Sequence, residues 1–163
     1  MIAYIGLGSN LAQPLTQLQS AIRHISSEPG LQCVKTSSFY QSKALTLEDA
    51  PVQNDYINAV VMLETAFSAE QLLQVLHKIE ALQGRERTSK WAARTLDLDI
   101  LLYGAEIINT ETLTIPHAQM QYRNFVIHPL YEIAGDIELP ALDCLSALVK
   151  KMPYNDLIKL SSY

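Results

Sequence analysis

The sequence is poor in cysteine, in positive charge and in long apolar runs, and each shortage excludes a class of protein. Its 163 residues include two cysteines, Cys33 and Cys144, which lie far apart and fit no metal-binding spacing. We interpret them as reduced thiols of a cytosolic protein, with a disulfide between them as the alternative. Twelve basic residues against 17 acidic ones give a formal net charge of −5, which argues against nonspecific binding to duplex nucleic acid.

Membrane and export signals are also missing. No apolar run approaches the ~20 residues that a membrane-spanning helix needs. The sequence starts MIAYIG, without the basic segment of a signal peptide, and leads directly into strand-like residues. We therefore expect a cytoplasmic protein with no membrane partner.

Two common phosphate-binding motifs fail as well. Residues 6–11 (GLGSNL) carry a leucine where a dinucleotide-binding motif needs its third glycine, and the sequence contains no GxxxxGK[ST] P-loop. We interpret Gly6 and Gly8 as permitting a tight exit from a strand, with Ser9 or Asn10 supporting the turn into a helix.

The most informative feature that is present is residues 94–102 (RTLDLDILL), which place Asp97 and Asp99 inside an apolar run. Aspartate is unfavourable in strands and is rarely buried without a partner. Residues i and i+2 of a strand share a face, so the two carboxylates would lie side by side, roughly 6.5 to 7 Å apart at Cα. They repel unless one is protonated or a cation such as Mg²⁺ lies between them. Two solvated aspartates at a strand end are the alternative.

A basic segment precedes this strand. Arg85, Arg87, Lys90 and Arg94 fall within ten residues, and Glu86 is the only acid among them. A basic loop that leads into an acidic strand suits a metal–polyphosphate complex, because the cations hold the phosphate oxygens while the carboxylates hold the metal.

Other polar and aromatic residues allow two interpretations each. Trp91, the only tryptophan, is either a loop anchor or a lid that stacks on a flat ligand. Tyr56 and Asn58 share one strand face, which suits either a half-exposed strand or a site that stacks on a heterocycle and hydrogen-bonds its edge. His117 and Arg123 lie six residues apart in a polar stretch and could bind phosphate. The histidines interpreted as structural or surface residues are His24, His77 and His128.

Hydrophobic periodicity predicts the order β-α-β-β-α-β, followed by a C-terminal extension. The expected elements are strands at 2–8, 31–42, 56–63 and the aspartate segment, a helix from Pro14 to the Glu28-Pro29-Gly30 stop, and a helix from the Ser68–Gln71 capping box to Gly84. A long loop at 43–54, a hairpin at 107–115 and short helices at 127–134 and 141–151 complete the prediction. This order matches the ferredoxin-like α+β fold, with a mostly antiparallel sheet and the two main helices on one face. Repeats and linkers are missing, so residues 1–163 are expected to form a single domain.

Six segments together resemble one known family. They are Gly8-Ser9-Asn10, Ser37-Ser38-Phe39-Tyr40, Tyr56-Ile57-Asn58-Ala59, Gln83-Gly84-Arg85, residues 91–100 (WAARTLDLDI) and Ile115-Pro116-His117. In these segments, and over nearly its whole length, the chain resembles the 6-hydroxymethyl-7,8-dihydropterin pyrophosphokinases of folate biosynthesis. The resemblance implies transfer of the β,γ-pyrophosphoryl unit of ATP to the pterin hydroxymethyl oxygen, with release of AMP.

The resemblance also implies a role for each matching residue. Asp97 and Asp99 would hold two Mg²⁺ ions and, with Arg85 and Arg94, form the catalytic set, in which Asp97 is also a candidate acceptor of the hydroxyl proton. The nucleotide-binding set is Leu73, Glu80, Arg85, Arg87, Trp91, Arg94, Ile100, Thr114, His117 and Arg123. The pterin-binding set is Ser42, Leu45, Tyr56, Asn58, Trp91, Asp97 and Phe125, with the ring between Tyr56 and Phe125. The chain departs from the family at residues 41–46, where many relatives carry prolines and a glycine.

Two other functions are compatible with the same residues. One is a different Mg²⁺-dependent phosphoryl or nucleotidyl transferase, which would release ADP or pyrophosphate in place of AMP. The other is a ferredoxin-like module that binds a nucleotide or a metal without turnover. In each case we expect a monomer that binds small molecules and no nucleic acid.

Overall fold

The computed structural model describes residues 1–11, 13–44, 48–49, 51–84 and 96–161, and a six-stranded sheet organises them. Strand β1 (Ile2–Ser9) pairs antiparallel with β4 (Tyr56–Thr65) on one side and with β5 (Asp97–Tyr103) on the other. Strand β4 pairs in turn with β2 (Leu31–Thr36) and β3 (Tyr40–Ser42), and β3 pairs with β8 (Ile158–Lys159). All of these pairings are antiparallel, and β5 forms one end of the sheet.

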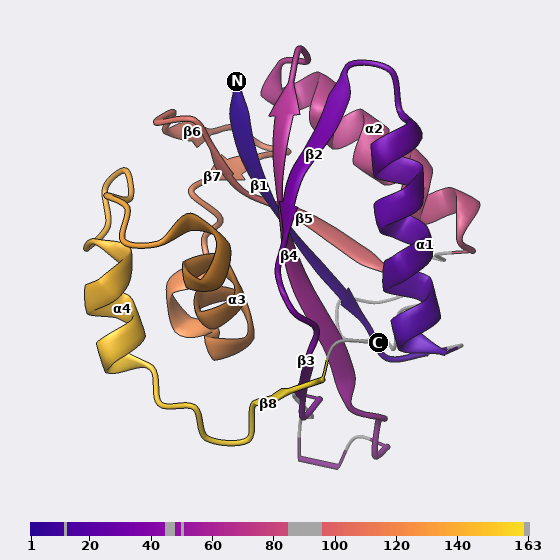
Figure 1. The fold of residues 1–163 in the computed structure, drawn as a ribbon, viewed down its shortest axis with the longest axis vertical. Helices are drawn as coiled ribbons and strands as arrows, with labels where there is room; N and C mark the ends of the chain where they lie inside the picture. Colours follow the sequence, from indigo (N-terminus) through magenta and orange to yellow (C-terminus); the bar gives the residue numbers. More distant parts are fainter. Residues whose placement is uncertain (12, 45–47, 50, 85–95, 162–163) are drawn as a thin grey trace.

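Helices cover both faces of the sheet (Figure 1). The two main helices, α1 (Pro14–Ser27) and α2 (Ala69–Leu82), lie together on one face, whereas α3 (Asn124–Ala134) and α4 (Leu145–Lys151) lie on the other. Each face has its own apolar core. The α1–α2 core includes Leu18, Ile25, Leu72, Leu76, Ile5 and Val61, and the α3–α4 core includes Val60, Leu101, Met120, Ile127, Leu130 and Leu145.

Local sequence accounts for most of these elements. Buried and more exposed residues alternate along the whole of β1. This alternation is expected for a strand with one face more deeply covered than the other. In α2 the Ser68 side chain accepts from Gln71 N–H and the Gln71 side chain accepts from Ser68 N–H, so the predicted capping box is present. The predicted ferredoxin-like α+β fold is confirmed, including both main helices on one face and the hairpin of β6 (Ile108–Asn109) and β7 (Thr114–Ile115).

The predicted strand at 31–42 is wrong as a single element, because β2 ends at Thr36 and β3 begins at Tyr40. Between them, Ser37 N–H donates to Val60 O at 2.9 Å, and Val60 N–H donates to the Ser37 hydroxyl at 2.9 Å. The side-chain oxygen of Ser37 thus takes the place of a backbone acceptor. Both short strands keep β4 as their partner across the break.

The C-terminal helices begin at other residues than predicted. Helix α3 begins at Asn124, three residues before the expected start, so Pro129 lies inside the helix and not in its first turn. Helix α4 begins at Leu145 and not at 141, because Ala141 has a φ of 57°, which is outside the helical region. A short 3₁₀ turn, η1 (Met120–Tyr122), precedes α3, and β8 was not predicted.

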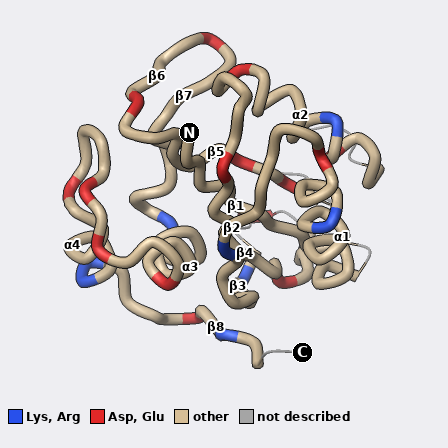
Figure 2. Tube along the Cα trace, turned by 45° about the horizontal axis from the view of Figure 1, so that its top comes forward, with Lys and Arg blue, Asp and Glu red and all other residues tan. Residues whose placement is uncertain are grey.

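Charged residues are distributed over several elements in the view of Figure 2, with Lys and Arg positions separated by Asp and Glu positions. Within the described residues, the helices are too short or too polar to cross a membrane.

Candidate active site

A cleft of about 620 Å³ brings together the residues that the sequence singled out. Strands β1, β4 and β5, helix α2, β7 and the start of α3 all contribute to its lining. Every described residue of the expected site lines it: Ser42, Tyr56, Asn58, Leu73, Glu80, Asp97, Asp99, Ile100, Thr114, His117, Arg123 and Phe125. The remaining expected residues, Leu45, Arg85, Arg87, Trp91 and Arg94, lie outside the described residues.

The two glycines of β1 form part of the cleft floor. Gly6 and Gly8 lie inside β1 and neither has a positive φ, so their interpretation as a strand exit is wrong. In the turn into α1, Gln13 has a φ of 61°, and the Ser9 hydroxyl donates to Leu11 O at 3.4 Å, so the predicted support of this turn by Ser9 is confirmed. A Cβ atom on Gly8 would lie 3.4 Å from Asn58 Oδ1 and 3.8 Å from Tyr56 Cδ1. The missing side chain therefore leaves space beside two residues of the expected pterin site.

The aspartates of β5 lie directly beside these glycines. Asp97 is registered against Gly8, and Asp99 against Gly6. Both aspartates are half-buried and line the cleft, whereas Leu98 between them is 2% exposed and packs into the α1–α2 core. The two carboxylates therefore lie on one face of β5, as predicted. The residues paired with them on β1 are glycines, which have no side chain.

His117 faces the second carboxylate. Its Nε2 lies 3.7 Å from Asp99 Oδ2, and its Nδ1 accepts from Gln119 N–H at 3.2 Å, which assigns the proton of the neutral ring to Nε2. Burial and the nearby Arg123 lower the pKa of His117, while Asp97 acts in the opposite direction. A neutral His117 thus presents an N–H donor beside Asp99, and its backbone N–H fixes it to Leu101 O at 3.0 Å.

Helix α2 holds the outer edge of β5 through Glu80. This side chain is 2% exposed, and its Oε1 accepts from Leu98 N–H at 2.8 Å. Since β5 ends the sheet, Leu98 N–H points away from β1 and finds its acceptor in the helix. The contact ties α2 to the segment that carries both aspartates.

His77, which the sequence predicts to be a structural or surface residue, is half-buried and lines the cleft. The spacing Leu73, His77 and Glu80 places all three on one helix face, which is the signal that could have found it. The other two interpretations are confirmed: His24 is exposed, and His128 is buried with its Nε2 2.8 Å from Met152 O.

Asn58 is fixed in place at the β3–β4 side of the cleft. Its Nδ2 donates to Ser42 Oγ at 2.8 Å and to Tyr40 O at 3.4 Å, and both Asn58 and Ser42 are buried. On the α3 side, Arg123 Cζ lies 5.9 Å from the centre of the Phe125 ring. The cleft thus combines fixed polar groups, an aromatic ring and a permanent cation.

The donor set suits a hard cation that keeps other ligands. Within the described part of the chain, no cluster of three or more His, Cys, Asp and Glu side chains could enclose a metal ion. Mg²⁺ typically binds proteins through one or two carboxylates and takes its remaining ligands from water and phosphate. Asp97 and Asp99 fit that pattern and do not fit a metal site made only of protein ligands.

Comparison with known proteins agrees with this geometry. The model of the family 7,8-dihydro-6-hydroxymethylpterin-pyrophosphokinase (HPPK) matches residues 4–135. A 2-amino-4-hydroxy-6-hydroxymethyldihydropteridine pyrophosphokinase of Haemophilus influenzae is 52% identical over 159 residues, covering 98% of both chains. The enzyme of the same name from Pseudomonas aeruginosa is 39% identical over 157 residues, covering 96% of this chain and 95% of the other.

Solved structures of low sequence identity share the fold. The HPPK-DHPS of Plasmodium falciparum, crystallised with pterin and p-hydroxybenzoate, superimposes with a TM-score of 0.70 at 15% identity over 92% of this chain. This chain spans only 42% of that longer protein. The match of the family model and the full-length relatives together confirm the resemblance, and the chain belongs to the 7,8-dihydro-6-hydroxymethylpterin-pyrophosphokinase family, the ATP-dependent enzymes that transfer pyrophosphate to hydroxymethyldihydropterin in folate biosynthesis.

Proposed function

We propose that Asp97 and Asp99 hold two Mg²⁺ ions against the triphosphate of ATP during pyrophosphoryl transfer to 6-hydroxymethyl-7,8-dihydropterin, with AMP as the released nucleotide. The observation that carries this proposal is the pair of half-buried carboxylates on β5, each registered against a glycine at the cleft floor. When bound, Mg²⁺ neutralises phosphate charge and reduces the repulsion that the incoming hydroxyl meets. The residues of the chain supply the positioning, on which this class of reaction mainly depends.

The nucleotide occupies the side of the cleft formed by α2, β7 and the start of α3. His117 Nε2–H and the Arg123 guanidinium are donors that suit phosphate oxygens, and Thr114 and Leu73 lie where the adenosine would be held. We extend the proposed phosphate-binding set to Arg85, Arg87 and Arg94 and the proposed nucleotide-binding set to Trp91; these residues lie outside the described part of the chain.

The pterin occupies the side formed by β4 and Phe125. Tyr56 and Phe125 are the two aromatic residues of the cleft lining, and we propose that the ring lies between them. The Asn58 amide, with its Nδ2 already bonded to Ser42, keeps Oδ1 for the edge of the heterocycle. Leu45 is proposed as a further contact and lies outside the described residues.

Asp97 is proposed to accept the proton of the pterin hydroxymethyl group. A general base shifts the pH dependence of the chemical step, whereas a residue that only binds metal lowers the rate at every pH. Asp97→Asn should therefore change the shape of the pH profile in single-turnover measurements. A profile that keeps its shape and is only lower would remove this role.

Chromatography of the nucleotides tests the function directly. The protein is mixed with ATP, Mg²⁺ and the reduced hydroxymethylpterin, with an Asp97→Asn/Asp99→Asn double variant as the control. We expect stoichiometric AMP and pterin diphosphate from the parent chain and neither product from the double variant or after chelation of Mg²⁺. ADP or free pyrophosphate would indicate a different transferase, and bound ATP without any product would indicate a binding module.

We also infer that residues 1–163 act as one domain and as a monomer in the cytoplasm. Both apolar cores pack against the same sheet, which supports a single domain. The two cysteines are free, as expected in a reducing compartment. Sedimentation at micromolar concentration tests the monomer.

A further inference from the structure

The segment 152–160 leaves α4, runs below α3 in the view of Figure 1 and joins the sheet as β8 beside β3. We call this segment the C-terminal strap. It lies beyond residues 4–135, the part that the family model matches. Most of the strap is on the surface, although Leu157 within it is only 6% exposed.

The strap is bonded to the start of α3, which is one wall of the proposed pterin site. Asn124 Nδ2 donates to Pro153 O at 3.5 Å and to Asn155 O at 3.2 Å. Asn124 stands between Arg123 and Phe125, and both of these neighbours line the cleft. Backbone carbonyls of the strap therefore hold Asn124, the residue directly before the proposed stacking residue Phe125.

The strap is also bonded to β3, next to the opposite wall. Tyr40 is registered against Lys159 in the antiparallel β3–β8 pair, and Leu160 N–H donates to Phe39 O at 2.9 Å. Strand β3 then carries Ser42, the hydroxyl that orients the Asn58 amide at 2.8 Å. Pairing with β8 gives β3 a neighbour on both sides and removes the freedom of an edge strand.

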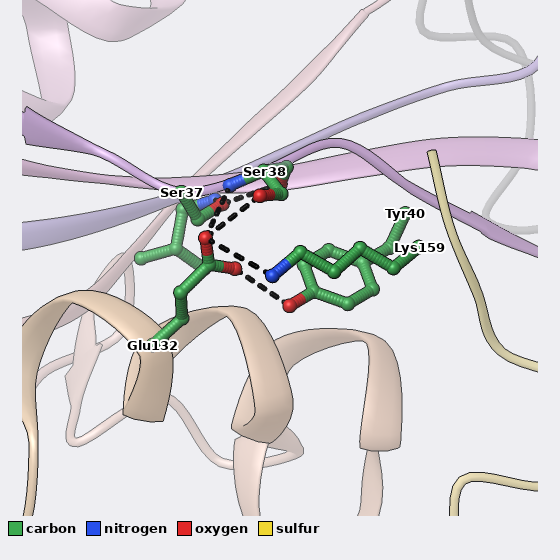
Figure 3. Close-up of polar contacts among 6 residues, drawn as sticks. Ser37, Ser38, Tyr40, Glu132 and Lys159 are labelled. Atoms are coloured by element: carbon green, nitrogen blue, oxygen red, sulfur yellow. Dashed lines mark hydrogen bonds and ion pairs between the residues drawn. The ribbon is translucent and has the colours of Figure 1, made fainter. Parts of the chain in front are cut away.

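Glu132 of α3 joins these parts at one carboxylate (Figure 3). Its Oε1 accepts from Ser38 N–H at 3.0 Å and from Ser38 Oγ–H at 2.7 Å, and its Oε2 accepts from Tyr40 O–H at 2.6 Å. Lys159 Nζ of the strap lies 3.7 Å from Oε1. One side chain on α3 thus fixes both β3 and the strap.

A second contact of the same kind lies nearby. The Tyr154 ring of the strap is centred 4.3 Å from the His128 ring of α3 and 6.5 Å from the Tyr40 ring of β3. Tyr154 and Lys159 of the strap therefore each contact both α3 and β3.

We propose that the C-terminal strap, held by Glu132, sets the separation of α3 and β3 and so positions Phe125 and the Ser42–Asn58 pair for the pterin ring. Glu132 is then a positioning residue, since it contacts β3 and the strap and does not line the cleft. This inference rests on the proposed pterin site. It predicts a larger effect on pterin than on ATP, because the strap bonds to α3, to β3 and to Lys43 after β3, and Arg123 is the one described residue of the proposed nucleotide side that adjoins these contacts.

The test compares ligand affinities of Glu132→Ala, Glu132→Gln and the parent chain. Titration calorimetry measures binding of a nonhydrolysable ATP analogue with Mg²⁺, and then of the pterin to that complex. We expect Glu132→Ala to weaken pterin binding about tenfold and to leave affinity for the analogue within about twofold. Glu132→Gln retains an acceptor for Ser38 and should recover part of the pterin affinity. In steady-state kinetics, the KM for the pterin should likewise rise in Glu132→Ala, whereas the KM for ATP should change little.

Asp136→Ala is the matched control, because Asp136 follows α3 and accepts from Ser146 N–H at 2.9 Å without touching the strap. It should lower the melting temperature and leave both affinities unchanged.

Asn124→Ala provides a second variant, which removes the hydrogen bonds between α3 and the carbonyls of Pro153 and Asn155 in the strap. It should show the same pterin-selective loss. Equal losses for both ligands, or a lower melting temperature with pterin affinity unchanged, would overturn the inference. The proposed function is tested separately by turnover of the parent chain. The inference about the strap is tested by comparing the ligand affinities of each variant with those of the parent.

Discussion

At the scale of single residues, the cleft depends on pairing each aspartate with a residue that has no side chain. Asp97 lies beside Gly8, and Asp99 beside Gly6. Carboxylates on an apolar strand are unfavourable by themselves, and bulky neighbours would both crowd a bound ion and exclude its water. Each aspartate of β5 and its glycine partner on β1 thus lie side by side in the cleft lining, although they are about 90 residues apart in the sequence.

Replacing one aspartate should separate activity from stability. Asp99→Ala removes a proposed metal ligand, and we expect turnover to fall at least about a hundredfold. Its side chain is 37% exposed and its contact with His117 spans 3.7 Å, so unfolding should remain cooperative and the free energy of unfolding should change by less than about 1 kcal/mol. AMP release as a function of Mg²⁺ concentration and thermal unfolding measure the two effects. The exposed Asp143, changed to Ala, is the control. A large gain in melting temperature with unchanged turnover would contradict the metal role.

The cleft floor permits a graded test at Gly8. An alanine Cβ there would meet Asn58 Oδ1 at an ordinary contact distance of 3.4 Å, and the backbone has no positive φ to resist the change. Gly8→Ala should therefore fold normally, whereas Gly8→Val adds methyl groups between Asn58 and Tyr56 and should raise the KM for the pterin about tenfold. Melting temperatures of both variants should stay close to that of the parent. If valine leaves the pterin KM unchanged, the ring does not lie over β1.

At the scale of elements, strand β5 is held against helix α2 by the buried side chain of Glu80. Glu80 was expected only as a residue near the adenosine, and the structure adds its bond to Leu98 N–H at 2.8 Å. A buried N–H without an acceptor is costly, so this bond couples α2 to strand β5.

Removing the Glu80 carboxylate should therefore destabilise the protein. Glu80→Ala leaves Leu98 N–H buried, which costs about 2 kcal/mol, or about 4 to 8 °C in melting temperature for a chain of this size. Gln74→Ala, an exposed position on the same helix, is the control and should change little. Denaturant unfolding gives the free energy. An unchanged stability in Glu80→Ala would show that water or another acceptor replaces the carboxylate for Leu98 N–H at no cost.

How far the elements could be predicted depends on where their signals lie. The alternation in β1 and the Ser68 capping box are local, and the sequence indicates both correctly. Strand β8 consists of two exposed residues without alternation, and its partner β3 is more than 110 residues away, so only tertiary structure selects it. Helix α3 starts three residues before its predicted start, and Pro129, which locally favours a first turn, lies inside the helix.

The site was predictable to a similar degree. The carboxylate pair follows from the period of a strand, residue patterns indicated the Tyr56–Asn58 and His117–Arg123 pairs, and the resemblance to a family added Ser42, Leu73, Glu80, Ile100, Thr114 and Phe125. The roles of Gly6, Gly8 and His77 needed the pairing of β1 with β4 and the packing of α2, which residue patterns alone do not contain.

At the scale of the whole molecule, Glu132 connects a helix on one face of the sheet, an inner strand and the chain terminus. Burial raises the pKa of Glu132, but hydrogen bonds from Tyr40 and Ser38, and the charge of Lys159, outweigh it and leave the pKa below its ordinary value. A carboxylate with a lower pKa in the folded state stabilises the fold above its unfolded pKa of about 4.3, and this contribution is lost as the pH falls through the folded value.

Acid denaturation should therefore reveal this connection. Glu132→Gln lacks the titrating group, so the parent should be more stable than the variant by a constant amount from about pH 8 to about pH 5, with the difference shrinking below about pH 4. Urea unfolding of both proteins at several pH values measures it, and Glu106→Gln, at an exposed position of the connection between β5 and β6, is the control. The outcome that contradicts the prediction is a difference that grows in acid, because that sign requires a carboxyl whose folded pKa is raised. A shrinking difference accompanied by loss of pterin affinity would tie the acid sensitivity of the fold to the same carboxylate that positions the substrate.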